Sequence, residues 1–301
     1  MTWSINEEVE FREALIDEVI NAANMGDGML SRQELGEFPY KGNVIRLIDP
    51  QGGIWNPSTS WTITEPLTGT LSINTTLSGV YEDQELSGGL WRYDYQAGGV
   101  EGKNSKLRKA WEFQLPVLWF RQQAPSKKYV PYKIYVIDDH PNENYCLIAP
   151  DLGLSVAYRS GNEAERRYAE RVIKQRLHQP AFRARVLNAY ETRCAVCNLQ
   201  LGQLLEGAHI TPDSDPNTST SVTNGISLCK IHHSAYDHKL LGIDPDYKLH
   251  TRADILEISD GPMLKWGLQE VNEREMILPR SRDSWPDKSR LKVRFTSFLN
   301  Q

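Results

Sequence analysis

The 301-residue chain lacks the features that mark membrane and secreted proteins. No stretch approaches the roughly 18 apolar residues of a membrane-spanning helix. Residues 1–10 carry acidic side chains, whereas a signal peptide would carry basic residues followed by an apolar run. Internal repeats and low-complexity stretches are absent as well. We therefore expect a cytoplasmic protein that has no membrane partner.

Cysteine is scarce: there are four residues, and three of them, Cys194, Cys197 and Cys229, fall within one short stretch. In a reducing compartment, such clustering favours a metal site over disulfide bonds. Cys146 stands apart from the cluster, and we expect it to be a buried core residue.

An excess of positive charge is also lacking, because 34 Lys and Arg face 39 Asp and Glu, for a net charge of −5. This balance argues mildly against a nucleic-acid partner. Basic residues nevertheless concentrate in residues 166–185 and 280–294. Either stretch could contact a phosphate backbone. Either could instead be a solvated surface, since acids stand at ion-pair spacing to arginines in the first stretch.

The length suggests two domains, and the pattern of residues changes along the chain. Residues 7–24 have apolar side chains near helical spacing, and Ser31 with Glu34 fits a capping box at the start of a second, short helix. From residue 42 to residue 151, short runs of β-branched and aromatic residues are separated by Gly, Pro, Asn and Asp, which predicts strands.

A polar, arginine-rich helix is expected over residues 163–177, ended by Gln179 and Pro180, with Pro180 at the first position of the next helix. The sequence thus predicts an α+β protein. Its expected parts are a mostly β recognition domain with N-terminal helices (residues 1–152), a basic helical linker (residues 153–180) and a C-terminal domain with a basic tail (residues 181–301).

Two pairs of metal-binding residues share the same spacing, Cys194-x-x-Cys197 and Cys229-x-x-His232. Two such pairs, about thirty residues apart, are typical of a closed, tetrahedral structural zinc site. Thiolate ligands favour zinc over magnesium. If the first pair were a redox or core motif, the second pair would be a coincidence. The sequence therefore predicts a zinc ion held by these four side chains.

A second set of polar residues lies between and beside these pairs: His209, Asn224, His233 and Asp237. Adjacent residues on a helix point about 100° apart. If His232 faces the zinc, His233 faces elsewhere, and Asp237 shares the face of His233. One imidazole and one carboxylate are thus expected together without the use of any zinc ligand, and they could hold a second metal.

The order His209, Asn224, His233 between these two pairs resembles the HNH nucleases with a ββα-metal fold. In that family a β-hairpin carries the first His, a loop carries the Asn and a helix carries the last His. The resemblance covers roughly residues 180–250 and includes the sequences AHI, NGxxLC and HHxxYD. This resemblance implies an HNH nuclease domain in the C-terminal part of the chain.

The resemblance implies metal-dependent hydrolysis of phosphodiester bonds. His209 is the expected general base, because imidazole titrates near neutral pH. Asn224 is expected to fix that ring or its loop. His233, with Asp237, is expected to hold Mg²⁺ or a related ion such as Mn²⁺ or Ni²⁺. Many family members place an Asp directly before the base, whereas this chain has Ala208, so another acid such as Glu206 or Asp213 is a candidate to contribute.

In the β-rich region, residues 79–121 resemble the SRA (YDG) domains that recognise modified cytosine, in the sequences YED, YQAGG and NxxL. The resemblance implies that a base is flipped into a pocket, stacked on aromatic faces and read by a polar group. The predicted pocket residues are Tyr81, Asp83, Trp91, Tyr93 and Tyr95. Aromatic residues at this spacing are alternatively core residues, and Gly98-Gly99 is alternatively a hairpin turn.

The leading hypothesis is a modification-dependent restriction endonuclease that selects double-stranded DNA through modified cytosine. A second hypothesis keeps the nuclease but has the N-terminal domain read unmodified sequence, phosphorothioate DNA or a protein partner. A third is a non-catalytic zinc-knuckle DNA-binding module, which would not need His209, Asn224 and His233. Because one active site cuts one strand, a homodimer is expected from symmetry.

Overall fold

The computed structural model separates into two compact units. The sheet unit comprises Met1–Ala23 and Met29–Pro180, and the C-terminal unit comprises Asn24–Gly28 and Ala181–Gln301. The structure describes residues 3–60, 63–77, 84–86, 90–97, 99–124, 126–154, 163–213, 215 and 218–300.

Among its described residues, the sheet unit contains a sheet of seven strands in the order β3-β4-β7-β8-β9-β6-β5. β4 and β7 are parallel and the other neighbouring pairs are antiparallel. A bulge interrupts the pairing of β8 with β9 between Val136 and Asp138. The strands are β3 (Ile54–Trp55), β4 (Ser72–Thr75), β5 (Gln84–Glu85), β6 (Trp91–Asp94), β7 (Val117–Gln122), β8 (Tyr129–His140) and β9 (Tyr145–Ala149). Residues 60–64 (SWTIT) lie in the region where the sequence predicts strands, but their described residues form none.

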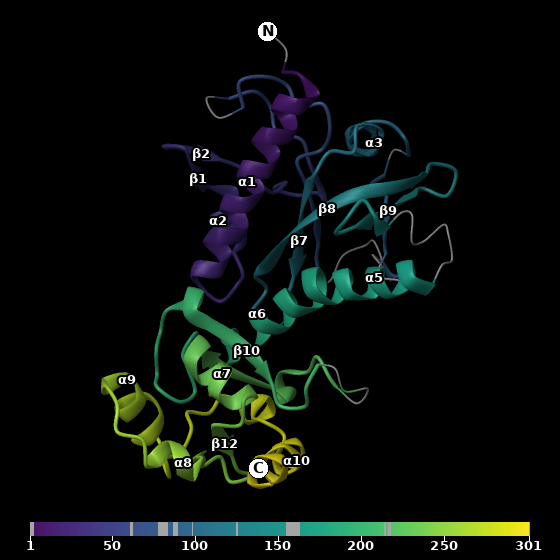
Figure 1. Cartoon of the computed structure of the whole chain (residues 1–301). Coiled ribbons are helices and arrows are strands. Elements are labelled where there is room, and N and C mark those ends of the chain that lie inside the picture. Colours follow the sequence, from purple (N-terminus) through teal and green to yellow (C-terminus); the bar gives the residue numbers. More distant parts are fainter. Residues whose placement is uncertain are drawn as a thin grey trace. The chain divides into compact units, whose positions relative to one another are not determined.

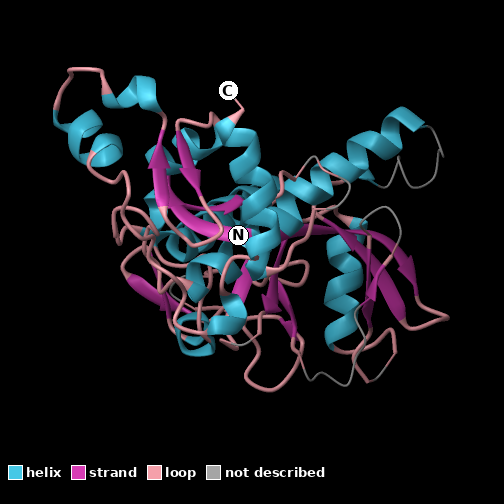
Figure 2. Ribbon diagram, turned by 90° about the horizontal axis from the view of Figure 1, so that it is seen from below, coloured by secondary structure: helices cyan, strands magenta, loops and turns pink. Residues whose placement is uncertain are grey.

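Helices and a small hairpin cover this sheet. The long helix α1 (Ile5–Met25) buries Leu15, Ile16 and Val19 in a core that includes Leu118 and Phe120 of β7. Helix α3 (Lys103–Glu112) packs along β8 (Figure 2). The other elements are α2 (Arg32–Gly36), β1 (Phe38–Tyr40) and β2 (Asn43–Ile45), and α2 begins at the predicted capping box.

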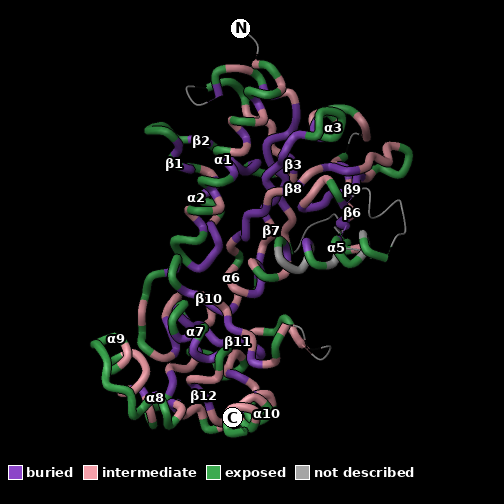
Figure 3. Tube along the Cα trace, viewed as in Figure 1, coloured by how far each residue is buried: buried purple, intermediate pink, exposed green. Residues whose placement is uncertain are grey.

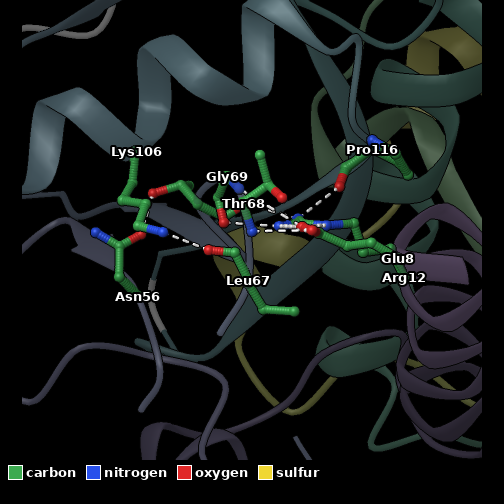
Figure 4. A network of polar contacts seen from close by, with 9 residues as sticks. Glu8, Arg12, Asn56, Leu67, Thr68, Gly69, Lys106 and Pro116 are labelled. Carbon is green, nitrogen blue, oxygen red and sulfur yellow. Dashed lines mark hydrogen bonds and ion pairs between the residues drawn. The ribbon is translucent and has the colours of Figure 1, made fainter. Parts of the chain in front are cut away.

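A buried ion pair ties α1 to the chain beside β4 and β7 (Figure 4). The Arg12 side chain is fully buried and bonds to Glu8 at 2.7 Å. Arg12 also donates to the carbonyls of Gly69, Thr70 and Pro116 at 2.7–3.0 Å. The second oxygen of Glu8 accepts from the Thr68 amide at 2.8 Å. Both buried charges therefore have several partners, as buried ions require.

Helices α5 (Glu163–Ile173) and α6 (Gln179–Ala189) are joined by a π-helical turn, η1 (Lys174–His178). The predicted break at Gln179-Pro180 is therefore wrong. Proline lacks the amide that an α-helical bond requires, and here a wider π turn lies directly before it instead of a break.

The core of the C-terminal unit is a hairpin and a helix, labelled β10 and α7 in Figure 1. β10 (Leu205–His209) pairs antiparallel with β11 (Gly225–Cys229), and α7 (Lys230–Asp237) follows directly. Figure 3 shows buried residues along β11, both buried and intermediate residues along β10, and mostly exposed residues in α9. The smaller elements are η2 (Gly202–Leu204), η3 (Val222–Asn224), β12 (Leu241–Ile243), β13 (Leu249–Thr251), α8 (Ala253–Leu256), α9 (Pro262–Leu264), η4 (Lys265–Gln269), η5 (Arg282–Ser284) and α10 (Lys288–Leu299).

Within the described residues, no helix combines the length and the apolar character needed to cross a bilayer.

Candidate functional site

The structure brings the predicted zinc residues together. The ligand atoms of Cys194, Cys197, Cys229 and His232 all lie within 4.8 Å of one another. His232 Nδ1 is 3.1 Å from the Cys229 sulfur and 3.5 Å from the Cys194 sulfur. Ligands about 2.3 Å from a tetrahedral zinc lie close to 3.7 Å apart. The cluster therefore has the donor set and the size to hold a zinc ion.

Backbone hydrogen bonds shape the two halves of this cluster. In the first, the Asn198 amide donates to the Cys194 carbonyl at 3.0 Å, and Asn198 takes a left-handed conformation with a φ of 61°. The chain thus turns sharply around the two thiols. In the second, Cys229 is the N-cap residue of α7. A helix N-terminus favours a thiolate.

His232 is oriented by a bond on the far side of its ring. Its Nε2 lies 2.7 Å from the Gly267 carbonyl, which can only accept, so Nε2 donates and Nδ1 faces the thiols. Outer contacts of this kind commonly fix metal-binding histidines. Burial lowers the pKa of His232, but its hydrogen bonds to Cys194 and Cys229 outweigh that effect and raise the pKa to about 10. Without metal, the cluster therefore retains a proton.

A second group of polar side chains gathers between β10 and α7. His233 Nδ1 is 2.6 Å from Glu206 Oε2, and His233 Nε2 is 3.3 Å from Asp237 Oδ2. His233 and Asp237 stand one helical turn apart, as their spacing predicts. Glu206 comes from the hairpin. The His233 side chain is 24% exposed and that of Asp237 is 53% exposed, so a ligand can reach the pair.

The C-terminal helix α10 reaches this group from outside the hairpin and helix. Arg294 Nη2 lies 3.3 Å from Asp237 Oδ1 and donates to the Tyr236 carbonyl at 3.1 Å. One turn earlier, Arg290 Nη1 donates to Thr211 Oγ1 at 2.8 Å. These two arginines could not be connected with the site from the sequence, because a basic tail is equally consistent with a solvated surface.

Asn224 is fully buried and holds the loop that follows His209. Its Oδ1 accepts from the Thr211 amide at 2.9 Å, and its Nδ2 donates to the Ser219 carbonyl at 2.9 Å. Its backbone carbonyl accepts from the Ile210 amide at 2.9 Å. Of the two roles expected for Asn224, these contacts favour fixing the loop.

His209 ends β10, and its ring stacks on Phe182 of α6 with centroids 3.9 Å apart and planes tilted by 10°. Phe182 also packs against Gly225, where an added Cβ would lie 2.9 Å from Phe182 and 2.4 Å from Val186. Gly225 is therefore needed for the close approach of α6 to the hairpin. Sequence reasoning missed Phe182, because an apolar helix residue carries no functional signal.

The predicted base-pocket residues lie in and after β6, where they are described. Trp91, Tyr93 and Tyr95 are all buried. The Tyr93 hydroxyl donates to the Gly53 carbonyl at 2.9 Å, and the Tyr95 hydroxyl donates to Asp139. The Trp91 ring lies 5.2 Å from that of Trp119, and the Arg121 guanidinium lies 4.0 Å from the centroid of Trp91. Tyr81 and Asp83 lie outside the described residues.

Two arginines of the first basic stretch are engaged within the protein. Arg176 donates to the Pro150 carbonyl and to Asp151, at 2.9 and 2.8 Å. Arg183 donates to the carbonyls of Leu205 and Gly202, at 3.0 and 2.6 Å. In these two residues the guanidinium groups stabilise local structure.

Residues 194–244 match the model of the HNH endonuclease family. The chain therefore contains an HNH endonuclease domain, which confirms the resemblance predicted for this part. The match includes both zinc-type pairs, β10, β11 and α7, and it ends before α10. No curated protein matches the chain.

Three solved structures resemble the chain at low TM-scores. The modification-dependent restriction endonuclease TagI is 17% identical, with a TM-score of 0.31 over 82% of this chain and 85% of that one. A complex of the SUVH5 SRA domain with methylated CHH DNA is 18% identical, with a TM-score of 0.30 over 42% and 88%. The type IV phosphorothioation-dependent endonuclease ScoMcrA is 12% identical, with a TM-score of 0.22 over 55% and 49%. These scores are too low to establish a shared fold.

Proposed function

We propose that the protein is a metal-dependent DNA endonuclease in which His209, Asn224, His233 and Asp237 act on one phosphodiester bond. The observation that carries this proposal is the hairpin followed by a helix: β10 ends at His209, β11 begins directly after Asn224, and α7 presents His233 and Asp237 one turn apart. A zinc-knuckle module that only bound DNA would not need this second set of side chains.

The His233–Asp237 pair suits a divalent ion in its spacing. Neighbouring ligands of an octahedral ion, each about 2.1 Å from it, lie about 3 Å apart, close to the 3.3 Å between Nε2 and Oδ2. Both groups are partly exposed, so water and phosphate oxygens can complete the coordination. When bound there, Mg²⁺, Mn²⁺ or Ni²⁺ would offset the charge of the scissile phosphate and of the departing oxygen.

His209 is the proposed general base. Water attacks the phosphorus atom and gives its proton to the His209 imidazole, while the bond from phosphorus to the leaving oxygen breaks. The stack on Phe182 fixes the plane of the imidazole ring. Asn224 holds the loop that begins at Ile210, so the backbone on both sides of His209 is constrained. This constraint reduces the cost of placing the base against the water.

We further propose that the sheet unit selects DNA carrying modified cytosine. Support comes from the SRA-like sequences of residues 79–121 and from Asn104, which ties the YQAGG loop to α3. Asn104 is buried, and its amide donates to the carbonyls of Gln96 and Gly99 at 2.8 and 2.6 Å. The proposed pocket comprises Tyr81, Asp83, Trp91 and Tyr93. The fifth predicted residue, Tyr95, is assigned to the core, because its buried hydroxyl donates to Asp139. The alternatives are that the sheet unit reads unmodified sequence, phosphorothioate DNA or a protein partner.

The test is cleavage of one plasmid in four matched forms: unmodified, with 5-methylcytosine, with 5-hydroxymethylcytosine and with phosphorothioate. Each form is incubated with Mg²⁺, Mn²⁺ or Ni²⁺. Cutting confined to a modified-cytosine form is the expected result. Phosphorothioate-only cutting would replace the proposed specificity, and equal cutting of all four would remove the modification sensor. Binding to DNA with no cutting under any condition would overturn the nuclease proposal.

Double-strand cutting by one active site per chain normally needs two chains, one for each strand, so we propose a homodimer on DNA. Sedimentation of the protein with a cleavable duplex should give a mass of two chains. A single chain on the duplex, combined with cuts in both strands, would contradict the dimer.

A further inference from the structure

We infer that Glu206 is a positioning residue of the nuclease site, whose carboxylate holds His233 in the tautomer that presents Nε2 to the metal. The inference rests on the proposed role of His233 and Asp237 as metal ligands. Glu206 lies on β10 and His233 on α7, so their contact also joins the hairpin to the helix.

The two ring nitrogens of His233 have different neighbours. Nδ1 is 2.6 Å from Glu206, and a carboxylate can only accept, so Nδ1 donates its proton. Hydrogen bonds from N–H to oxygen usually measure about 2.7–3.2 Å, which makes this contact short. On the other side, the 3.3 Å between Nε2 and Asp237 exceeds that range. The proton therefore belongs on Nδ1, and the lone pair of the neutral ring belongs on Nε2.

This arrangement matches the way proteins orient metal-binding histidines. A carboxylate that accepts from one ring nitrogen fixes the tautomer and the ring plane, and makes the other nitrogen a stronger ligand. The free nitrogen of His233 then faces the Asp237 carboxylate at a spacing suited to neighbouring ligands of one ion. Glu206 thus acts through His233 and does not need to touch the ion.

The alternation of side chains along β10 explains why Glu206 is the acid that contacts His233. Gly207 and His209 face α6: an added Cβ at Gly207 would lie 3.4 Å from Phe182, and His209 stacks on the same ring. Glu206 and Ala208 therefore share the face toward α7. Ala208 is fully buried and offers no ligand atom. The acid on this strand face thus stands two residues upstream of Ala208.

Asp237 is held on its other side by a residue of α10. Arg294 contacts its Oδ1 at 3.3 Å, which leaves Oδ2 toward His233. Glu206, His233, Asp237 and Arg294 thus form a continuous row across β10, α7 and α10. Both candidate ligands are oriented before any ion binds, and this preorganisation reduces the entropy lost when the ion binds.

The experiment compares Glu206→Ala and Glu206→Gln with wild type in the full-length, zinc-loaded protein. Glu257→Ala removes an exposed carboxylate that follows α8 and is the matched control. Calorimetric titration with Mn²⁺ gives metal affinity. Nitrogen-15 NMR of the histidine side chains gives the tautomer of His233 at a pH where the ring is neutral. The His233 signals are assigned by their loss in His233→Gln. Zinc content and the melting temperature report folding.

Wild type should have its His233 proton on Nδ1, and Glu206→Ala should weaken Mn²⁺ binding by about 10- to 100-fold. Glu206→Gln should weaken Mn²⁺ binding by less than about 10-fold, because its amide oxygen still accepts the hydrogen bond from His233 Nδ1. Unchanged affinity and tautomer in Glu206→Ala would overturn the inference. If Glu206→Gln lost as much Mn²⁺ affinity as Glu206→Ala, Glu206 would be a metal ligand and not a positioning residue. A wild-type protein that binds no Mn²⁺ would also refute the positioning role.

Failure of the inference can be distinguished from failure of the proposed function. If wild type cuts DNA while Glu206→Ala is unaffected in tautomer and affinity, the nuclease stands and the positioning role falls. If wild type binds Mn²⁺ with the expected tautomer but cuts no form of DNA, the positioning role stands and the nuclease proposal falls.

Discussion

The two units of the molecule use polar side chains in opposite ways. In the sheet unit, the buried Glu8–Arg12 pair is surrounded by backbone partners, and the Tyr95 hydroxyl donates to Asp139. In the C-terminal unit, the His233–Asp237 pair is oriented on its outer sides but remains partly exposed. Closed networks of the first kind stabilise a fold, whereas a half-open pair of the second kind can take a ligand.

The units also differ in how far apart in sequence their contacts lie. Arg12 reaches carbonyls 57 to 104 residues away. The four zinc-type side chains all lie between residues 194 and 232. The stability of the sheet unit therefore depends on distant pairings, whereas that of the C-terminal unit depends on a local cluster that a metal can close.

Removing a zinc ligand should have the largest effect. Cys194→Ser should lose the bound zinc and unfold the C-terminal unit, because structural zinc can supply about 10–16 kcal/mol of apparent binding energy. Metal analysis and hydrogen exchange, read separately over the two units, measure this effect. Cys146→Ala, at the lone cysteine buried on β9, should keep its zinc. A zinc-free Cys194→Ser protein with wild-type exchange in the C-terminal unit would refute the structural role.

Breaking the buried ion pair should destabilise the other unit. Arg12→Met leaves the Glu8 carboxylate buried without its partner, which typically costs about 3–5 kcal/mol. Urea unfolding followed by tryptophan fluorescence measures the loss, and zinc content should not change. Lys109→Met is the control, because both side chains of the Lys109–Glu112 pair are about half exposed, and such pairs contribute about 1 kcal/mol or less. Equal effects of the two variants would contradict the comparison.

Tyr95→Phe distinguishes a core residue from a pocket residue. Burial and the hydrogen bond to Asp139 raise the pKa of the Tyr95 phenol. Removing the hydroxyl leaves the Asp139 carboxylate with Arg108 as its remaining described partner. We expect a loss of about 1–3 kcal/mol in unfolding free energy and no change in which plasmid form is cut. Unchanged stability together with altered preference would instead place Tyr95 in the base pocket.

The smallest expected effect is a dependence of zinc affinity on pH. Because the pKa of His232 is raised to about 10, the metal-free cluster carries a proton that zinc must displace. Affinity should therefore rise with pH below that value, by about tenfold per pH unit for each proton released. Competition with a chelator across a pH series measures this slope. A flat profile would show that zinc displaces no proton.

The zinc residues and the shared face of His233 and Asp237 could be predicted because their pattern is local, whereas the hairpin was expected only from the resemblance to the HNH family. Paired ligands at fixed spacing specify a knuckle, and His233 and Asp237 share a face by helical geometry alone. Glu206 could be named as a candidate acid, but not placed, because its contact with His233 spans 27 residues of sequence. That contact depends on strand alternation and on how α7 packs against the hairpin.

Other features had no signal in the sequence. Phe182 and Arg294 look like an ordinary core residue and an ordinary basic residue, and only tertiary packing places them beside His209 and Asp237. The strand order of the sheet and its parallel pair, β4 with β7, could not be predicted either. Short apolar runs predict strands but do not specify their partners.

The central claim, that His209 is the base of a metal-dependent nuclease, is tested most directly by plasmid cleavage with and without Mn²⁺. Wild type is compared with His209→Ala and with His250→Ala, a histidine that lies between Asp244 and Glu273 in the same unit. We predict that wild type and His250→Ala cut only with metal. His209→Ala should lose about 10²- to 10⁴-fold in rate while retaining zinc and DNA binding. Cleavage by His209→Ala at the wild-type rate would contradict the account.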